Sequence, residues 1–115
     1  MTDILTRIID QKKVEVAALD PAGLRQAALD SPAPRDFIAA LRQRRAGSPI
    51  ALIAELKRAS PSKGLLAPHL DLFQVAELYA ENGAAATSVL TDEKFFLGQL
   101  ETLREQFSEA QVRLA

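Results

Sequence analysis

The spacing of apolar residues along the chain changes at Gly47. Before Gly47, apolar positions recur every three or four residues, which predicts three helices, at 3–19, 21–29 and 35–45. The first is expected to bury one stripe of its surface. Asp20-Pro21 marks the start of the second, because aspartate caps a helix N-terminus and proline fits its first turn. Gly47 is the expected stop of the third helix.

After Gly47, short apolar runs alternate with helical spacing. Continuous runs at 49–56 and 85–90 predict strands buried on both faces. Helical spacing predicts a helix over 72–81, capped by Asp71, and another over 99–108. A third apolar run begins at Val112 and reaches Ala115. This order predicts an α/β fold with a parallel sheet and right-handed crossovers.

The same change of pattern divides the chain into a helical part, 1–47, and a strand-bearing part, 48–115. Two strand–helix units and the start of a third strand do not cover both faces of a parallel sheet. We therefore expect the chain to be the front part of a larger fold.

Composition narrows the class of protein. A chain of 115 residues, 48% of them hydrophobic, suits one modest globular domain. The formal net charge of -1 favours neither nucleic acid nor an anionic membrane as a partner. The absence of cysteine and the single histidine, His69, argue against a metal site built on these ligands. No signal peptide and no apolar run of roughly 18 residues is present, so a soluble cytoplasmic protein is expected.

The candidate chemistry lies at the end of the first predicted strand. Glu55 and Lys57 are two positions apart, so on a strand they project from the same face. Active residues of α/β folds lie at the carboxyl ends of strands. A structural salt bridge is the alternative interpretation. Function is favoured, because inward-facing charges are costly unless they are paired or used.

Two loops add candidate ligand contacts. The turn Ser60-Pro61-Ser62-Lys63-Gly64 offers hydroxyls and backbone amides to an anion, although an ordinary exposed turn explains it equally well. Its spacing is not that of a nucleotide-binding P-loop. In the loop at 91–98, Phe95 and Phe96 suit the wall of a pocket for a planar ligand, or one of them anchors the loop in the core. Asp92 is expected to order this loop.

Together these segments resemble indole-3-glycerol-phosphate synthase, the (β/α)8-barrel enzyme of tryptophan biosynthesis. The resemblance rests mainly on Glu-Leu-Lys-Arg-Ala-Ser-Pro-Ser at 55–62 and Ser-Val-Leu-Thr-Asp at 88–92, followed by Phe95-Phe96 and Gly98. It runs along essentially the whole chain. It implies the amino-terminal portion of a TIM barrel, with about two βα units and the start of a third strand, preceded by a helical extension.

The resemblance implies a decarboxylating ring closure without a cofactor or a metal. The substrate is 1-(2-carboxyphenylamino)-1-deoxyribulose 5-phosphate, a small phosphorylated anthranilate derivative, and the product is indole-3-glycerol phosphate. By motif position, Glu55 corresponds to the carboxylate that orients the catalytic groups, and Lys57 to the lysine that engages the anionic groups of the substrate. The implied substrate contacts are Arg58, Ser60 near the phosphate and Phe96 against the anthranilate ring.

The resemblance also implies that the general-acid lysine and the general-base glutamate lie beyond Ala115. A full barrel needs about 250 residues, so we expect the 115 residues alone to be inactive. An alternative from another class is a non-catalytic interaction module that self-associates through exposed strand edges. A fragment of a different phosphate-binding barrel is disfavoured by the combination of Glu55 and Lys57 with Phe95-Phe96.

Overall fold

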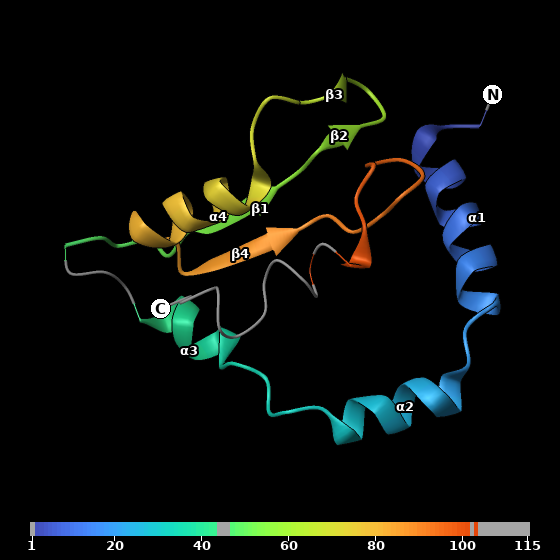
Figure 1. The fold of residues 1–115 in the computed structure, drawn as a ribbon, viewed down its shortest axis with the longest axis horizontal. Helices are drawn as coiled ribbons and strands as arrows, with labels where there is room; N and C mark the ends of the chain where they lie inside the picture. Colours follow the sequence, from blue (N-terminus) through green and yellow to red (C-terminus); the bar gives the residue numbers. More distant parts are fainter. Residues whose placement is uncertain (1, 44–46, 102, 104–115) are drawn as a thin grey trace. The chain divides into compact units, whose positions relative to one another are not determined.

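The computed structural model describes residues 2–43, 47–101 and 103. Their contacts form two compact units, Met1–Arg35 and Asp36–Ala115. The short third helix is thus grouped with the strands, whereas the change of sequence pattern placed a boundary between 47 and 48. The first unit holds α1 (Ile4–Ala17) and α2 (Pro21–Asp30). The second holds α3 (Phe37–Arg42), β1 (Ile53–Leu56), β2 (Ala59–Ser60), β3 (Gly64–Leu65), α4 (Leu72–Glu81) and β4 (Ala86–Val89) (Figure 1).

An aspartate starts each of the four helices α1 to α4. Its side chain accepts a hydrogen bond from a backbone amide of the first turn, which satisfies one of the donors that a helix N-terminus leaves free. The predicted caps of α2 and α4 are confirmed. The donors are Thr6 N to Asp3, Ala22 N to Asp20, Ala39 N to Asp36 and Phe73 N to Asp71. None of the helices among the described residues is both long and apolar enough to cross a membrane.

Two predictions about the helices are wrong. Helix α3 ends at Arg42 and not near Gly47, because Gln43 takes an extended backbone conformation that cannot continue a helix. No residue of α1 is buried, so the expected buried stripe is absent from that helix. Its two valines, Val14 and Val16, are exposed; positions two apart lie on different sides of a helix and cannot share one stripe.

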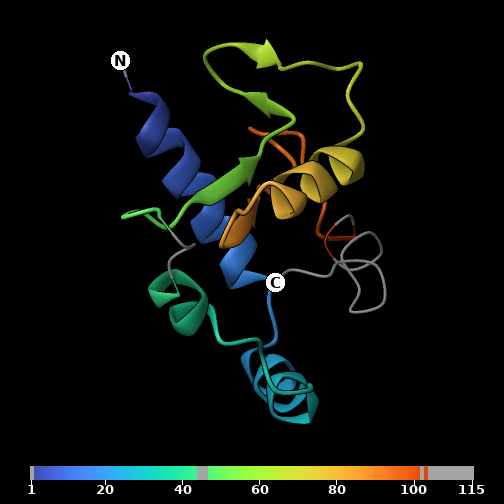
Figure 2. The same cartoon turned by 90° about the vertical axis from the view of Figure 1, so that its left-hand side faces the viewer.

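The strands β1 and β4 pair in parallel, with α4 between them in the chain. This confirms the predicted strand–helix–strand order and the parallel pairing. Helix α4 contacts both strands and lies along one side of the pair (Figures 1 and 2). The core of this unit is small: Leu56 is 2% exposed, and Ala54 and Ala76 are also buried.

The prediction of a strand over 49–56, buried on both faces, is only partly met. Strand β1 begins at Ile53, and its side chains alternate between exposed and buried. Ala54 and Leu56 are buried, whereas Ile53 and Glu55 on the alternate face are exposed. A second layer of side chains is needed to bury both faces of a parallel sheet, and the described residues place only two strands in this sheet.

A short antiparallel hairpin, β2 with β3, continues from the end of β1 (Figure 1). The sequence predicted a turn here but no strands, because two-residue strands are too short to show an alternating pattern. Gly64 has a positive φ of 64°, a conformation that suits glycine and closes the three-residue connection. The hairpin is anchored through Ala59, which is buried.

Residues 100, 101 and 103 are helical, in agreement with the start of the helix predicted over 99–108. The rest of that helix and the apolar run from Val112 to Ala115 lie outside the described residues.

Candidate active site

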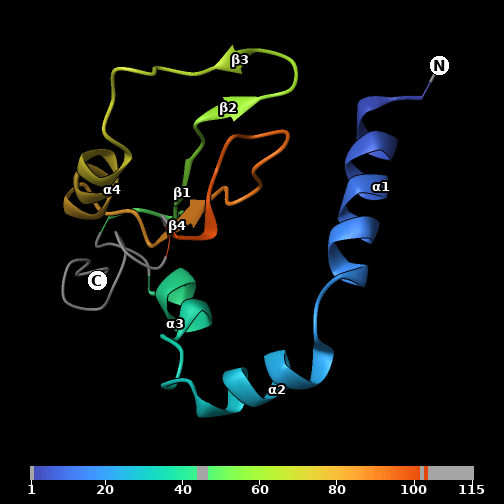
Figure 3. The same ribbon diagram turned by 45° about the vertical axis from the view of Figure 1, so that its right-hand side comes forward.

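The segments that follow β1 and β4 lie beyond the same end of the two strands (Figures 1 and 3). Parallel pairing causes this arrangement, because β1 and β4 run in the same direction and their carboxyl ends lie at the same end of the sheet. The register places Glu55 of β1 opposite Ser88 of β4. Side chains opposite each other in a sheet project from the same face, so Glu55 and Ser88 are neighbours on the exposed face.

The two oxygens of the Glu55 carboxylate have different partners. The Ser88 hydroxyl donates a hydrogen bond of 3.1 Å to Oε2. The Nζ of Lys57 lies 3.4 Å from Oε1. The Glu55 and Lys57 side chains are 45% and 35% exposed, so water and a small ligand can reach both charges. The prediction that they project together is confirmed.

Phe96 also lies near the Lys57 ammonium group. The Nζ of Lys57 is 5.8 Å from the centroid of the Phe96 ring, within range of a cation–π interaction. Phe95 faces a different cation, with its ring centroid 6.0 Å from the Nζ of Lys94. Of the two adjacent phenylalanines, Phe96 therefore joins the charged pair at the end of β1.

Asp92 orders the loop that carries Phe96, as the sequence predicted. Its Oδ2 accepts hydrogen bonds from the backbone amides of Phe95 and Phe96, at 2.7 and 3.1 Å. The Gly98 amide closes the loop by donating to the Asp92 carbonyl at 2.7 Å. A Cβ atom at Gly98 would overlap the Leu90 carbonyl oxygen, so this position requires glycine.

Ser60 ends β2, and its described hydrogen bonds are to residues of the hairpin turn. Its Oγ accepts a hydrogen bond of 3.2 Å from the Lys63 amide and lies 3.5 Å from the Ser62 hydroxyl. Arg58 is exposed just before the hairpin. Within the described part of the chain, neither Arg58 nor Ser60 bonds to Glu55, Lys57 or Phe96. The structure thus brings together three of the five predicted site residues and places the other two in the adjacent segment.

Sequence reasoning missed Ser88 as a member of this cluster. The residue belongs to the Ser-Val-Leu-Thr-Asp segment, but nothing local distinguishes it from Thr87 or Thr91. The signal that identifies it is the register between β1 and β4, which pairs it with Glu55. Register depends on contacts between distant segments and is not visible in either segment alone.

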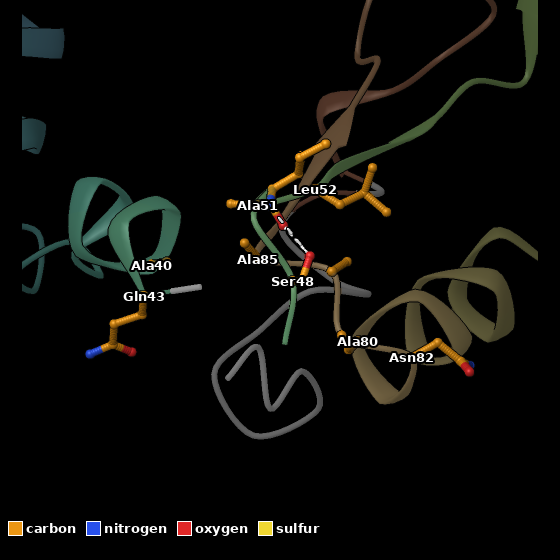
Figure 4. Close-up of a pocket in the computed structure, with 11 residues that line it drawn as sticks. Ala40, Gln43, Ser48, Ala51, Leu52, Ala80, Asn82 and Ala85 are labelled. Atoms are coloured by element: carbon orange, nitrogen blue, oxygen red, sulfur yellow. Dashed lines mark hydrogen bonds between the residues drawn. The ribbon is translucent and has the colours of Figure 1, made fainter. Parts of the chain in front are cut away.

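A hollow of about 630 Å³ lies at the opposite, amino end of the strands (Figure 4). Among the described residues, the lining has no charged side chain, and it includes Ala51, Leu52, Ala85 and Ser48. The Ser48 hydroxyl is occupied by a hydrogen bond of 2.9 Å to the Ile50 carbonyl, and the amide of Asn82 points away from the hollow (Figure 4). None of the candidate site residues is among the described residues that line this hollow.

Comparison with known proteins covers nearly the whole chain. The family model described as indole-3-glycerol phosphate synthase matches residues 5–114. The chain is 51% identical over 107 residues to the indole-3-glycerol phosphate synthase of Roseiflexus sp. (strain RS-1), covering 90% of this chain and 39% of that protein. It is 44% identical over 110 residues to the synthase of Chloroherpeton thalassium, covering 90% of this chain and 42% of that protein.

A third relative, the synthase of Burkholderia lata, is 49% identical over 108 residues, covering 91% of this chain and 41% of that protein. The chain therefore spans about two fifths of the length of the curated relatives it matches. The family model covers far more than half of the chain, and it includes both segments that build the Glu55, Lys57 and Phe96 cluster. The chain belongs to the indole-3-glycerol phosphate synthase family.

Proposed function

We propose that this chain supplies the amino-terminal portion of a TIM barrel that converts 1-(2-carboxyphenylamino)-1-deoxyribulose 5-phosphate into indole-3-glycerol phosphate. The observation that carries the proposal is the position of Lys57, with its ammonium group 3.4 Å from Glu55 Oε1 and 5.8 Å from the Phe96 ring centroid. This cation, carboxylate and aromatic face lie together at the carboxyl end of the parallel strands, where α/β enzymes carry their chemistry.

The reaction joins the ring carbon that bears the carboxyl group to the ketone carbon of the sugar chain. Carbon dioxide then leaves that ring carbon, and the former ketone oxygen departs as water, which completes the indole. Closure requires the two carbons to be held in contact, so positioning supplies much of the rate. A cation near the anionic groups of the substrate offsets their negative charge, and an acid must protonate the leaving hydroxyl.

Each residue of the cluster has a role that its surroundings support. Lys57 engages an anionic group of the substrate, because its ammonium group is accessible and only partly offset by Glu55. Glu55 orients the catalytic groups and polarises the substrate. Phe96 offers a ring face to the anthranilate ring, by the stacking that aromatic pairs favour. Ser60, at the end of β2 in the adjacent hairpin, contacts the phosphate, and Arg58 lines the same opening.

The test joins residues 1–115 to the carboxyl-terminal portion of the Roseiflexus relative and follows the formation of indole-3-glycerol phosphate by fluorescence. We expect turnover by this chimera and none by the 115 residues alone, because the acid and base of the family are implied to lie beyond Ala115. Lys57→Met should lower kcat/KM about 100-fold or more. Lys13→Met removes the same charge from an exposed site in α1 and should leave turnover unchanged. Equal activity of Lys57→Met and the unmodified chimera would refute the role of Lys57.

A second candidate function, self-association of the chain, is favoured by one observation. Large apolar side chains, Ile50, Leu52 and Ile53, are exposed in and just before β1, beside a sheet in which the described residues place two strands. An apolar strand with free edges is a template for pairing with another copy. Sedimentation velocity across a hundredfold range of concentration decides this. A mass that rises with concentration supports self-association, and a constant monomer mass refutes it.

A further inference from the structure

We propose that Ser88 is a positioning residue for Glu55, whose hydroxyl holds the carboxylate so that Oε1 faces Lys57. This inference rests on the proposed function for the role of Glu55 in the reaction. The hydrogen bond itself, 3.1 Å from Ser88 Oγ to Glu55 Oε2, is a property of the chain alone.

The sheet makes Ser88 a rigid support. Ser88 and Glu55 are directly opposed in a parallel ladder, so backbone hydrogen bonds hold both Cα atoms. Serine has a short side chain, and its hydroxyl position is defined by one torsion and the backbone. The contact therefore ties a flexible glutamate to the neighbouring strand, which neither Lys57 nor the solvent can do.

The contact matters because the two oxygens of the Glu55 carboxylate have different partners. The ion pair between Glu55 and Lys57 joins two side chains of one segment, both of them partly solvated, and it leaves the glutamate free to rotate. The hydrogen bond from Ser88 to Oε2 fixes the plane of the carboxylate and directs Oε1 toward Lys57. If the Glu55 carboxylate points elsewhere, it is no longer close to Lys57 or the substrate, even though its charge is unchanged.

Thr87 provides the matched control. Thr87 directly precedes Ser88 on β4 and is opposite Ala54, so it lies on the other face of the sheet. Its Oγ1 is buried and has no hydrogen-bond partner within the described part of the chain. Thr87→Val removes a hydroxyl of the same strand at nearly constant volume and leaves the Glu55 contact in place.

The first experiment uses the 115-residue chain and needs no activity. The χ1 and χ2 scalar couplings and the carboxyl 13C shift of Glu55 are measured for the unmodified chain and for Ser88→Ala, Ser88→Thr and Thr87→Val. We expect averaged couplings in Ser88→Ala, single-rotamer couplings in Ser88→Thr, and no change in Thr87→Val. Retained couplings in Ser88→Ala would overturn the proposal.

The second experiment introduces the same substitutions into the active chimera. We expect Ser88→Ala to lower kcat about tenfold with KM unchanged, and Ser88→Thr to recover it, because only the orientation of Glu55 is lost. If Ser88→Thr lowers kcat as much as Ser88→Ala does, or if Ser88→Ala only raises KM, the result would count against positioning. If the unmodified chimera forms no indole-3-glycerol phosphate, the proposed function fails, whereas the Glu55 couplings still decide whether Ser88 holds the carboxylate.

Discussion

The Lys57 ammonium group and the Phe96 ring face each other, with 5.8 Å between Nζ and the ring centroid. This contact joins the end of β1 to the loop after β4, two segments that are distant in the chain. It depends on the loop being held in one conformation. Two features hold it: the carboxylate of Asp92 and the absence of a side chain at Gly98.

Replacing Asp92 by alanine should move Phe96 away from Lys57. The Phe95 and Phe96 amides lose their common acceptor, and hydrogen bonds to a charged group contribute about 2 kcal/mol to stability. The Lys57 Hε protons should lose the ring-current shift of Phe96 in NMR spectra. Asp92→Asn keeps a carbonyl acceptor and should retain part of the shift. An unchanged shift in Asp92→Ala would mean that other contacts hold the loop.

Gly98→Ala should disturb the same loop by a different route. The added Cβ overlaps the Leu90 carbonyl oxygen, so backbone must move, at a cost of about 1–3 kcal/mol in the free energy of unfolding. Gly64→Ala is the control, since its Cβ meets nothing within 4 Å but its φ is positive. Both variants lose stability in urea titrations, and only Gly98→Ala should shift the Phe96 resonances. Equal spectra at Phe96 would count against the steric argument.

Local signals predicted the helices well. The range of α4 was predicted to the residue, because Asp71 begins it and Asn82-Gly83 follows its last turn. The end of α3 was not predicted, since nothing in the sequence marks Gln43 as the residue that leaves the helical conformation. The exposure of Val14 in α1 was also missed, because an apolar residue reveals its burial only through its neighbours in space.

Some features of the candidate site could also be predicted from the sequence, and others could not. The period of two along a strand was sufficient to place Glu55 and Lys57 on one face. The choice of Phe96 over Phe95 as a substrate contact follows from the family resemblance, whereas the proximity of Phe96 to Lys57 is seen only in the structure. Ser88 could not be found locally, because its role depends on the register of β4 against β1. Pairwise geometry between distant segments is what sequence patterns leave open.

The small core of the second unit makes Leu56 important for its stability. Leu56 is 2% exposed, and Leu56→Ala should lower the free energy of unfolding by about 2–5 kcal/mol through lost burial and a cavity. Leu65→Ala is the matched control, because Leu65 is 58% exposed and surface changes stay within about 0.5 kcal/mol. Urea titration monitored by circular dichroism measures both. Similar losses for the two variants would contradict the assignment of Leu56 to the core.

The cap of α1 should make that helix sensitive to acid. The Thr6 backbone amide and hydroxyl donate to the Asp3 carboxylate, which lowers the pKa of Asp3 below its usual value. A lowered pKa in the folded state means that the cap stabilises the helix fully above the ordinary aspartate pKa of about 3.9 and is lost as pH falls through the lower folded value. The amide shift of Thr6, followed from pH 6 to pH 2, should report this loss. In Asp3→Asn the acceptor does not ionise, so the Thr6 shift should lose this titration. A Thr6 shift that titrates identically in both proteins would show that Asp3 is not the group responsible.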